Sequence, residues 1–337
     1  MDCFAFVIHP VDPKIDVARK YPHLTHALPT RLVHFLSRFW PPVRLSHITG
    51  VRSEATGKKI EGWLLACPLT ARQVLELPTW AVYNKITATG RLAQRLGAQI
   101  LGLGAFMSVV GDAGMTVARR LDIPVTTGHS FTVATALEAL ETGARCKGVR
   151  LESSTAAVIG ATGSIGQACA ELLAPMVDGL ILVGRSESRL AQMQAQLEAA
   201  TACRVRVSIQ VDDIREADLV ISTTSAARPV VQPEHLKRGA IVCDMALPPD
   251  VSPRVARERS DVLVIGGGVV DVPGEVDFGF NFGLAPGKAY ACLAETMTLA
   301  LDGRYESYSL GKEVRVEQVH EIAQLAWKHG FRLSAIC

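Results

Sequence analysis

Short apolar runs alternate with helix-like stretches through the second half of the chain. The runs are AAVIG, GLILVGR, RVRVSIQ, DLVISTTS, AIVCDMA and VLVIGGGVV, beginning at residues 156, 179, 204, 218, 240 and 262. Apolar runs bounded by turn residues are typical of buried strands. Strands that alternate with helices are typical of a parallel sheet covered by helices on both faces. We therefore predict a doubly wound α/β domain of the Rossmann type over residues 151–286.

The first half of the chain has a weaker pattern of the same mixed kind. RLVHFLSRFW (31–40) predicts a short amphipathic helix, and two β-like runs flanking residues 55–58 predict a hairpin. A helix is predicted over residues 70–97, a strand within AQILGLGAF (98–106) and a helix within AGMTVARRLD (113–122). These elements predict an α/β domain that binds the substrate.

The domain boundaries follow from the helices between and after these patterns. Residues 126–143 have apolar positions at helical spacing and end at a glycine, so we expect 131–150 to link a domain over 1–130 to the Rossmann domain. Two further helices, each ending at a glycine, are predicted over 287–302 and 316–329. We expect residues 287–337 to complete the first domain.

Three glycines follow the first strand of the predicted Rossmann domain and open a helix, in the text VIGATGSIG. In this context the first glycine permits the tight turn, the second lets the backbone approach a pyrophosphate, and the third lets helix and strand pack closely. The helix N-terminus attracts the negative charge of the phosphates. The loop therefore predicts dinucleotide binding, the alternative being a tight structural turn. Its candidate residues are Gly160, Thr162, Gly163, Ser164, Ile165 and Gly166.

The end of the second strand indicates which dinucleotide is bound. An acidic residue that pairs with the ribose 2′-hydroxyl of NAD is common there, whereas this chain has Arg185 and Ser186, with Arg189 close behind. Arginine and serine suit a 2′-phosphate, so we predict NADP(H), and NADPH for a reductase. The alternative is that Arg185 is a solvated loop charge.

Two other segments are expected to line the cofactor. Thr223 and Thr224 follow the fourth strand, at the edge where open α/β sheets bind ligands. Gly267 and Gly268 follow the sixth strand and leave room for a nicotinamide against the backbone. Either segment is also compatible with a simple turn.

Composition supports a folded chain of two domains. The chain has 337 residues, of which 48% are hydrophobic and 20% charged, so it can bury a large core. The net charge of +2 does not call for nucleic acid. Residues 1–130 carry 15 basic against 8 acidic side chains, and the remainder carries 20 against 25. A basic N-terminal part can dock an acidic partner, unless the charges are merely scattered and solvated.

The sequence also predicts where the protein resides. The first ten residues lack the features of a signal peptide, and the longest apolar run, 100–111, is shorter than the roughly 20 residues of an integral membrane span. The eight cysteines are widely spaced and form no metal-binding motif, and we expect them to be reduced and mostly inert. We therefore expect a cytoplasmic protein without a metal site.

The best candidate for the chemistry is Cys292, in KAYACLAETM (288–297). It lies near the start of a predicted helix, whose positive end is expected to lower the pKa of a thiol and favour the thiolate. The opposing interpretation is a core cysteine, which is the more common fate of a helical cysteine among Ala and Leu.

Several blocks resemble the long-chain acyl-(acyl-carrier-protein) reductases of cyanobacteria, which form fatty aldehydes. The blocks are SEATGKKIEGWLLAC (53–67), LGLGAFMSVV (101–110), TTGHSFTVA (126–134), VIGATGSIG (158–166), IGGGVVDVPGEVDF (265–278), YACLAETM (290–297) and KHGF (328–331). The domain layout also resembles shikimate dehydrogenase and glutamyl-tRNA reductase. In the reductase family a cysteine in the A-C-x-A-E-x-M text carries the acyl group, and Cys292 matches it.

The resemblance implies a two-step reaction on a fatty acyl thioester of acyl carrier protein or coenzyme A. Cys292 takes the acyl group, and NADPH reduces the resulting thioester to the aldehyde. His129 is a candidate proton donor, or else a capping or packing residue, and Glu295 lies on the face of Cys292 or pairs with Lys288. Acyl carrier protein would dock on the basic N-terminal part. Two alternatives remain: a cysteine-independent NADP-dependent dehydrogenase of a hydroxy- or amino-acid-like substrate, and a non-enzymatic NADP(H)-binding module.

Overall fold

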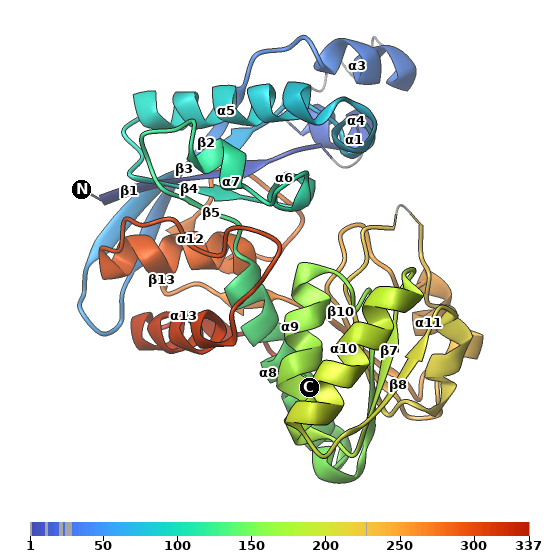
Figure 1. The fold of residues 1–337 in the computed structure, drawn as a ribbon. Coiled ribbons are helices and arrows are strands. Elements are labelled where there is room, and N and C mark those ends of the chain that lie inside the picture. The colour runs from blue at the N-terminus through green and yellow to red at the C-terminus, as the bar shows by residue number, and fades with distance from the viewer. Residues whose placement is uncertain (1, 11–12, 20–22, 24–28, 227, 337) are drawn as a thin grey trace. The chain divides into compact units, whose positions relative to one another are not determined.

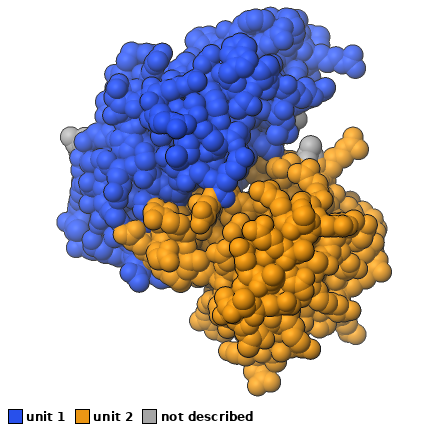
Figure 2. Space-filling view, viewed as in Figure 1, with its two compact units in different colours: residues 1–128, 270–312, 324–332 blue, residues 129–269, 313–323, 333–337 orange. Residues whose placement is uncertain are grey.

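The computed structural model describes residues 2–10, 13–19, 23, 29–226 and 228–336, which divide into two compact units (Figure 2). Unit 1 comprises residues 1–128, 270–312 and 324–332, and unit 2 comprises residues 129–269, 313–323 and 333–337. Each unit is built on a six-stranded sheet of described residues. The chain therefore has a mixed α/β fold, as the sequence predicts.

The sheet of unit 1 has the strand order β13-β2-β3-β1-β4-β5 (Figure 1). Its strands are β1 (Asp2–Ile8), β2 (Val43–Arg52), β3 (Lys59–Ala66), β4 (Ile100–Leu103), β5 (Val125–Thr126) and β13 (Gly274–Asp277). Strands β3, β1, β4 and β5 run parallel, whereas β2 pairs antiparallel with β3 and with β13. The β2–β3 pair confirms the predicted hairpin. Strand β1 is central because its run FAFV is completely buried.

Helices cover both faces of this sheet. Helix α5 (Thr79–Arg95) packs on β1 and β3, and α12 (Ala291–Asp302) packs on β1, β3 and β4 from the opposite side (Figure 1). The predicted helix over 70–97 is wrong as one element, because it forms α4 (Ala71–Glu76) and α5. Pro78 caps α5 and holds Leu77 extended, which interrupts the helix. The other helices are α1 (Pro13–Ala18), α3 (Thr30–Ser37), α6 (Phe106–Val109) and α7 (Met115–Ala118).

The C-terminal helices differ from prediction at one boundary. Lys288–Tyr290 forms a short strand, β14, so α12 begins at Ala291 and not at 287. It ends at Gly303, which has a left-handed backbone conformation, as expected for a helix-terminating glycine. Helix α13 spans Val316–His329, the predicted range. Of α12, ten residues are buried, which is why its sequence is apolar on nearly every side.

Unit 2 contains a parallel sheet in the order β11-β10-β9-β6-β7-β8. The strands are β6 (Thr155–Ile159), β7 (Gly179–Val183), β8 (Arg204–Ser208), β9 (Leu219–Ser222), β10 (Ile241–Asp244) and β11 (Leu263–Gly266). In sequence order this is the 3-2-1-4-5-6 arrangement of a Rossmann sheet, which confirms the predicted fold class. The predicted strand over 262–270 is divided, because Gly267 and Gly268 separate β11 from β12 (Val269–Asp271).

The sheet of unit 2 is flanked by α8 (His129–Lys147), α9 (Ser164–Leu173), α10 (Glu187–Ala200) and α11 (Pro253–Glu258). Helix α8 packs on α9 and on β9, β10 and β11. It approaches the sheet closely at Gly143, where a Cβ atom would lie 2.8 Å from Ile265 Cδ1. The remaining short elements are β15 (Arg332–Leu333) and four 3₁₀ turns, at Leu151–Ser153, Ala174–Met176, Val211–Glu216 and Pro233–His235.

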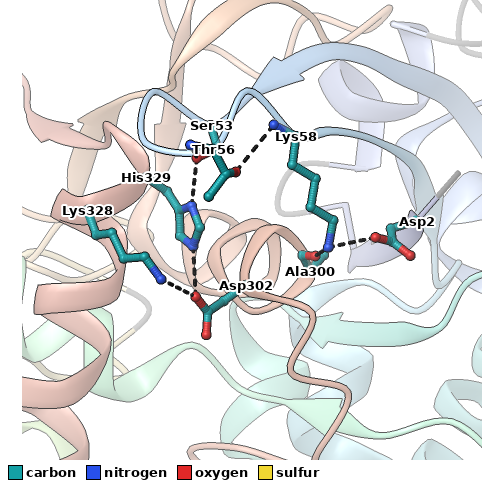
Figure 3. A network of polar contacts seen from close by, with 8 residues as sticks. All are labelled: Asp2, Ser53, Thr56, Lys58, Ala300, Asp302, Lys328 and His329. Atoms are coloured by element: carbon teal, nitrogen blue, oxygen red, sulfur yellow. Dashed lines mark hydrogen bonds and ion pairs between the residues drawn. The ribbon is translucent and has the colours of Figure 1, made fainter.

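A buried polar network ties the β2–β3 turn to the ends of two helices in unit 1 (Figure 3). Ser53 Oγ lies 2.8 Å from His329 Nδ1, and His329 Nε2 lies 3.1 Å from Asp302 Oδ1, which also accepts a bond from Lys328. A neutral His329 can make both hydrogen bonds: its Nε2–H donates to the Asp302 carboxylate, and its Nδ1 accepts the hydrogen bond of the Ser53 hydroxyl. Nearby, Lys58 Nζ donates to Ala300 O and pairs with Asp2. The turn is therefore anchored to the C-terminus of α12 on two sides.

The cysteines depart from expectation at one position. Cys3, Cys67, Cys169, Cys203, Cys243 and Cys292 are free thiols. Cys146 is disulfide-bonded, so the expectation of uniformly reduced thiols is wrong there. Within the described residues no cluster of His, Cys, Asp and Glu is arranged to hold a metal ion, and no helix has the length and apolarity needed to cross a membrane.

Candidate functional site

The glycine loop lies at the carboxyl end of β6, the point where the strand order of the Rossmann sheet reverses. Gly160 has a φ of +82°, and a Cβ there would lie 3.0 Å from the backbone oxygen of Thr223. Gly163 is the N-cap residue of α9, and no side chain accepts a hydrogen bond from the backbone amides at that helix end. A Cβ at Gly166 would clash with the backbone oxygen of Gly160. The loop therefore has the tight turn, open helix N-terminus and close packing that a pyrophosphate site requires.

The loop also borders the end of β7. The backbone amides of Gly160 and Ala161 both donate to Val183 O, at 2.9 and 3.1 Å. Thr162 lies beside Gly184, because a Cβ on Gly184 would be 3.3 Å from Thr162 Cγ2. Residue 184 leads directly into Arg185, so the structure brings the glycine loop and the predicted ribose-binding segment together.

The residues predicted to meet a 2′-phosphate lie on the surface after β7. Arg185 and Arg189 are exposed, and Ser186 is half-buried at the start of α10. Neither arginine forms an ion pair with any residue that the structure describes. Two guanidinium groups without a carboxylate partner leave their charge available to an anionic ligand.

The carboxyl end of β9 is fixed by a residue that the sequence analysis missed. Asp250 is fully buried and accepts hydrogen bonds from Ser222 Oγ at 2.7 Å, Thr224 N at 2.8 Å and Thr224 Oγ1 at 2.5 Å. Thr223 Oγ1 donates to Ile159 O at 3.1 Å. The Thr223 and Thr224 hydroxyl protons are therefore committed to the protein. The text around Asp250 contains no motif, and only the folded chain brings it beneath β9.

The three glycines at and after the end of β11 have different neighbouring atoms. A Cβ at Gly267 would overlap the Met245 sulfur, so the room left by this glycine is filled by protein. Gly268 has a φ of +72° and serves the turn into β12. Gly266 faces open space. The expectation that Gly267 and Gly268 line a nicotinamide stays a prediction, with the Met245 side chain on the Cβ side of Gly267.

Cys292 is the second residue of α12 and lies against a tight turn of the chain. Gly128, with a φ of +75°, passes so close that a Cβ there would clash with the Cα and Cβ of Cys292. Cys292 as a whole residue is half-buried, whereas its sulfur is enclosed by protein. This glycine directly precedes α8, which spans His129–Lys147, whereas the sequence predicts the linking helix over 131–150. The backbone of the TTG turn (126–128) and the start of α12 therefore form one compact structure around the cysteine.

The electrostatic surroundings of Cys292 oppose thiolate formation. Burial in the apolar start of α12 is the main cause, and the Glu295 carboxylate adds to it, so the pKa of the thiol rises to about 12. Backbone amides near the helix start lower the pKa only in part. The expectation that the helix start lowers the pKa of Cys292 overall is therefore wrong for this state of the protein.

Glu295 lies one helical turn beyond Cys292, as expected, and is completely buried. Its carboxylate accepts a short hydrogen bond from the Thr126 hydroxyl. Lys288 pairs instead with Asp271 at 2.7 Å. The next residue of the turn, Thr127, donates its hydroxyl to Ser309 O. The structure thus brings Cys292 and Glu295 together with Thr126 and Gly128.

His129 is the first residue of α8 and directly follows Gly128 in the chain. Its ring is buried, and burial lowers its pKa to about 4. The imidazole is therefore neutral near pH 7, and an imidazolium is not available there as a proton donor.

The fold and the glycine loop define the class of protein: an α/β chain with a Rossmann domain of the dehydrogenase type. In sequence, the family described as Shikimate / quinate 5-dehydrogenase matches residues 142–268. That match covers most of unit 2 and leaves unit 1 unassigned.

Two characterised proteins are similar over most of the chain. A long-chain acyl-[acyl-carrier-protein] reductase of Synechococcus elongatus is 28% identical over 88% of this chain and 90% of its own length. Aminotransferase PigE of Serratia sp. is 29% identical over 97% of this chain, which spans 39% of the length of PigE. Among solved structures, glutamyl-tRNA reductase of Methanopyrus kandleri aligns with 73% of this chain and 53% of its own, at 16% identity and a TM-score of 0.32.

Proposed function

We propose that this chain is an NADPH-dependent reductase that converts a fatty acyl thioester to the aldehyde through an acyl group held on Cys292. The observation that carries the proposal is the position of Cys292, half-buried at the start of α12 and in contact with the TTG turn, in a chain that also has a dinucleotide-type glycine loop. The similarity to a long-chain acyl-[acyl-carrier-protein] reductase over 88% of the chain supports the choice of substrate.

The residues of unit 2 fit a nicotinamide dinucleotide phosphate. The uncapped N-terminus of α9 and the cradle formed by Gly160 and Gly163 suit the pyrophosphate. Arg185 and Arg189, exposed and without an ion-pair partner among the described residues, suit the 2′-phosphate. When bound, the cofactor supplies the hydride that reduces the acyl group.

The chemistry assigned to the chain itself is acyl transfer. The Cys292 sulfur attacks the thioester carbonyl, a new carbon–sulfur bond forms, and the carrier thiol leaves with a proton. Because the pKa of Cys292 is raised, its proton must be removed as the attack proceeds.

We also propose that the basic N-terminal part docks the carrier. Residues 1–130 carry 15 basic and 8 acidic side chains, and both acyl carrier protein and coenzyme A present anionic groups. This attraction would be weakened by salt, since exposed charges are screened within about 10 Å at 0.1 M ionic strength.

The test is the intact mass of the protein after it is mixed with a long-chain acyl-CoA in the absence of NADPH. Wild type should gain one acyl group, and NADPH should discharge it as aldehyde. Cys292→Ala should gain none, whereas Cys3→Ala, which removes another half-buried free cysteine of unit 1, should behave as wild type. An acyl group that persists on Cys292→Ala, or its absence from wild type with acyl-CoA and acyl carrier protein substrates of several chain lengths, would reject the proposal.

A cysteine-independent dehydrogenase is the second candidate. It is favoured by the match of residues 142–268 to the Shikimate / quinate 5-dehydrogenase family and by the raised pKa of Cys292. The two candidates differ in their response to Cys292→Ala. A dehydrogenase that oxidises a hydroxy- or amino-acid-like substrate with NADP+ should keep its activity in that variant, whereas the acyl thioester reductase should lose it entirely.

A further inference from the structure

A buried acid–hydroxyl pair lies directly beside the contact between the TTG turn and Cys292. The Thr126 hydroxyl donates to the Glu295 carboxylate, and the same Thr126 oxygen accepts the backbone N–H of Gly128 at 3.3 Å. Gly128 in turn contacts the backbone of Cys292. On α12, the Thr296 hydroxyl donates to Cys292 O at 3.3 Å. A continuous set of contacts therefore runs from Glu295 through Thr126 and Gly128 to the cysteine.

Burial of the Glu295 carboxylate is energetically unfavourable at this place in the fold. It is 0% exposed, and the buried residues of α12 around it include Leu293, Ala294 and Met297. Burying a carboxylate is unfavourable, and an apolar residue of similar size would fill the space without that cost. The Thr126 hydroxyl offsets part of this cost, and it is itself fully buried.

The turn needs such an anchor because its backbone is held in an unusual shape. Gly128 adopts a left-handed φ of +75° directly at the contact with Cys292. Strand β5 before it pairs with β4, and Thr127 is fixed through Ser309 O. Thr126 is the residue of the turn whose side chain reaches both the Gly128 amide and α12. Loss of its hydroxyl would release the turn from the helix that carries the cysteine.

We propose that Thr126 and Glu295 are a positioning pair that fixes the Gly128 backbone against Cys292 and so sets how the thiol meets an acyl thioester. This inference rests on the proposed function and extends it to two residues that do not touch the acyl group. It assigns the buried carboxylate two roles: it holds the turn through Thr126, and its negative charge adds to the effect of burial in favouring the protonated thiol.

The first experiment compares Thr126→Val with Thr126→Ser. Valine matches the shape of threonine but lacks the hydroxyl, so acylation of Cys292 by acyl-CoA should slow about tenfold. This corresponds to a rise of about 1.4 kcal/mol in the activation free energy of acylation. Serine keeps the hydroxyl and should restore the rate to within about twofold. The matched control is Thr89→Val, which removes another buried hydroxyl of unit 1, one that donates to a helix carbonyl, Lys85 O, at 2.9 Å. It should leave the acylation rate unchanged.

The second experiment measures the pH profile of Cys292 alkylation by iodoacetamide, followed on the Cys292 peptide by mass spectrometry. Glu295→Gln keeps an oxygen that accepts the Thr126 hydroxyl but removes the charge, so the profile should shift to lower pH while the fold is retained. Alkylation does not require a thioester, so this readout is independent of the proposed function. A wild type that is alkylated as expected but never acylated would reject the proposed function alone.

Two results would overturn the proposal. The first, against the positioning pair, is a Thr126→Val variant that is folded, binds NADPH and is acylated at the wild-type rate. The second, against the role given to the Glu295 charge, is a Glu295→Gln alkylation profile that superimposes on that of wild type. If Thr126→Val does not fold, Thr126→Ala, which also lacks the hydroxyl, takes its place in the first comparison.

Discussion

At the scale of single residues, the raised pKa of the Cys292 thiol determines how the thiol is expected to react. Because its pKa is raised to about 12, the fraction of thiolate at pH 7 is very small. We predict that alkylation of Cys292 is slow at pH 7 and accelerates by about tenfold per pH unit up to pH 10 without a plateau. Peptide-level mass spectrometry checks this. A plateau below pH 8 would show that the helix start dominates over burial.

Arg185 is the residue that should decide between the two nicotinamide dinucleotides. Arg185→Ala removes an exposed charge that has no ion-pair partner among the described residues, so the fold should be unaffected. We predict that NADPH binding weakens about tenfold while NADH binding changes less than twofold. Fluorescence titration with both cofactors measures this. Arg254→Ala, which removes an exposed arginine paired with Glu258 on α11, is the control and should change neither affinity.

The candidate site was partly predictable from single residues. Cys292, Glu295 and the glycine loop each carry a local signal, because their roles depend on neighbours within a few positions in the chain. Asp250 and the pairing of Thr126 with Glu295 carry none, since Thr126 and Glu295 are brought together only by the packing of α12 beside β5. The prediction of a lowered pKa for Cys292 was wrong for the same reason. The position of a residue in a helix can be inferred from the local sequence, but its burial depends on the folding of the whole unit.

At the scale of secondary-structure elements, the junction of β6 and α9 depends on Gly166. A Cβ there would clash with the oxygen and carbonyl carbon of Gly160, which are backbone atoms and cannot move aside as a flexible side chain can. We predict that Gly166→Ala lowers the free energy of unfolding by about 2 kcal/mol and weakens NADPH binding. Gly266→Ala at the end of β11 is the control, because that position faces open space and should change stability by less than about 0.5 kcal/mol. Urea unfolding and cofactor titration measure both effects.

The elements predicted well are those whose pattern is repeated and unambiguous. The four inner strands of the Rossmann sheet, β6, β7, β9 and β10, are buried nearly throughout because both of their faces are covered, and they appear as short apolar runs between turns. Element boundaries were less predictable, because helical spacing continues through Pro78 and through Lys288–Tyr290. In the first case a proline breaks the helix, and in the second the chain extends as a strand before α12 begins.

At the scale of the whole molecule, the buried histidines His9, His129 and His329 make stability sensitive to acid. Burial lowers the pKa of His129 to about 4 and also lowers the pKa values of His9 and His329. Unfolding exposes the three rings, which then bind protons below their ordinary pKa of 6.5, so the unfolded state is favoured as pH falls. The stability is complete above pH 6.5 and is lost progressively below it, for His129 over the range from 6.5 to about 4.

We therefore predict that the free energy of unfolding falls between pH 7.5 and pH 5.5, and that His329→Asn reduces this fall. The variant loses the titrating ring, although it also weakens the network with Ser53 and Asp302 and is expected to be about 1–2 kcal/mol less stable at pH 7.5. Urea unfolding at the two pH values measures the difference. An equal fall in wild type and variant would mean that His329 does not contribute to the acid sensitivity.

The order in which the sheets of the two units appear in the chain differs from the order in which they are completed during synthesis. All strands of the Rossmann sheet lie within residues 155–266, so a ribosome delivers that sheet without interruption. The first sheet begins earlier, but its edge strand β13 and its covering helix α12 are made only with residues 274–302. The apolar face of β1 and β4 that α12 covers therefore stays uncovered while unit 2 is synthesised. During that time the face is open to aggregation or to chaperone binding.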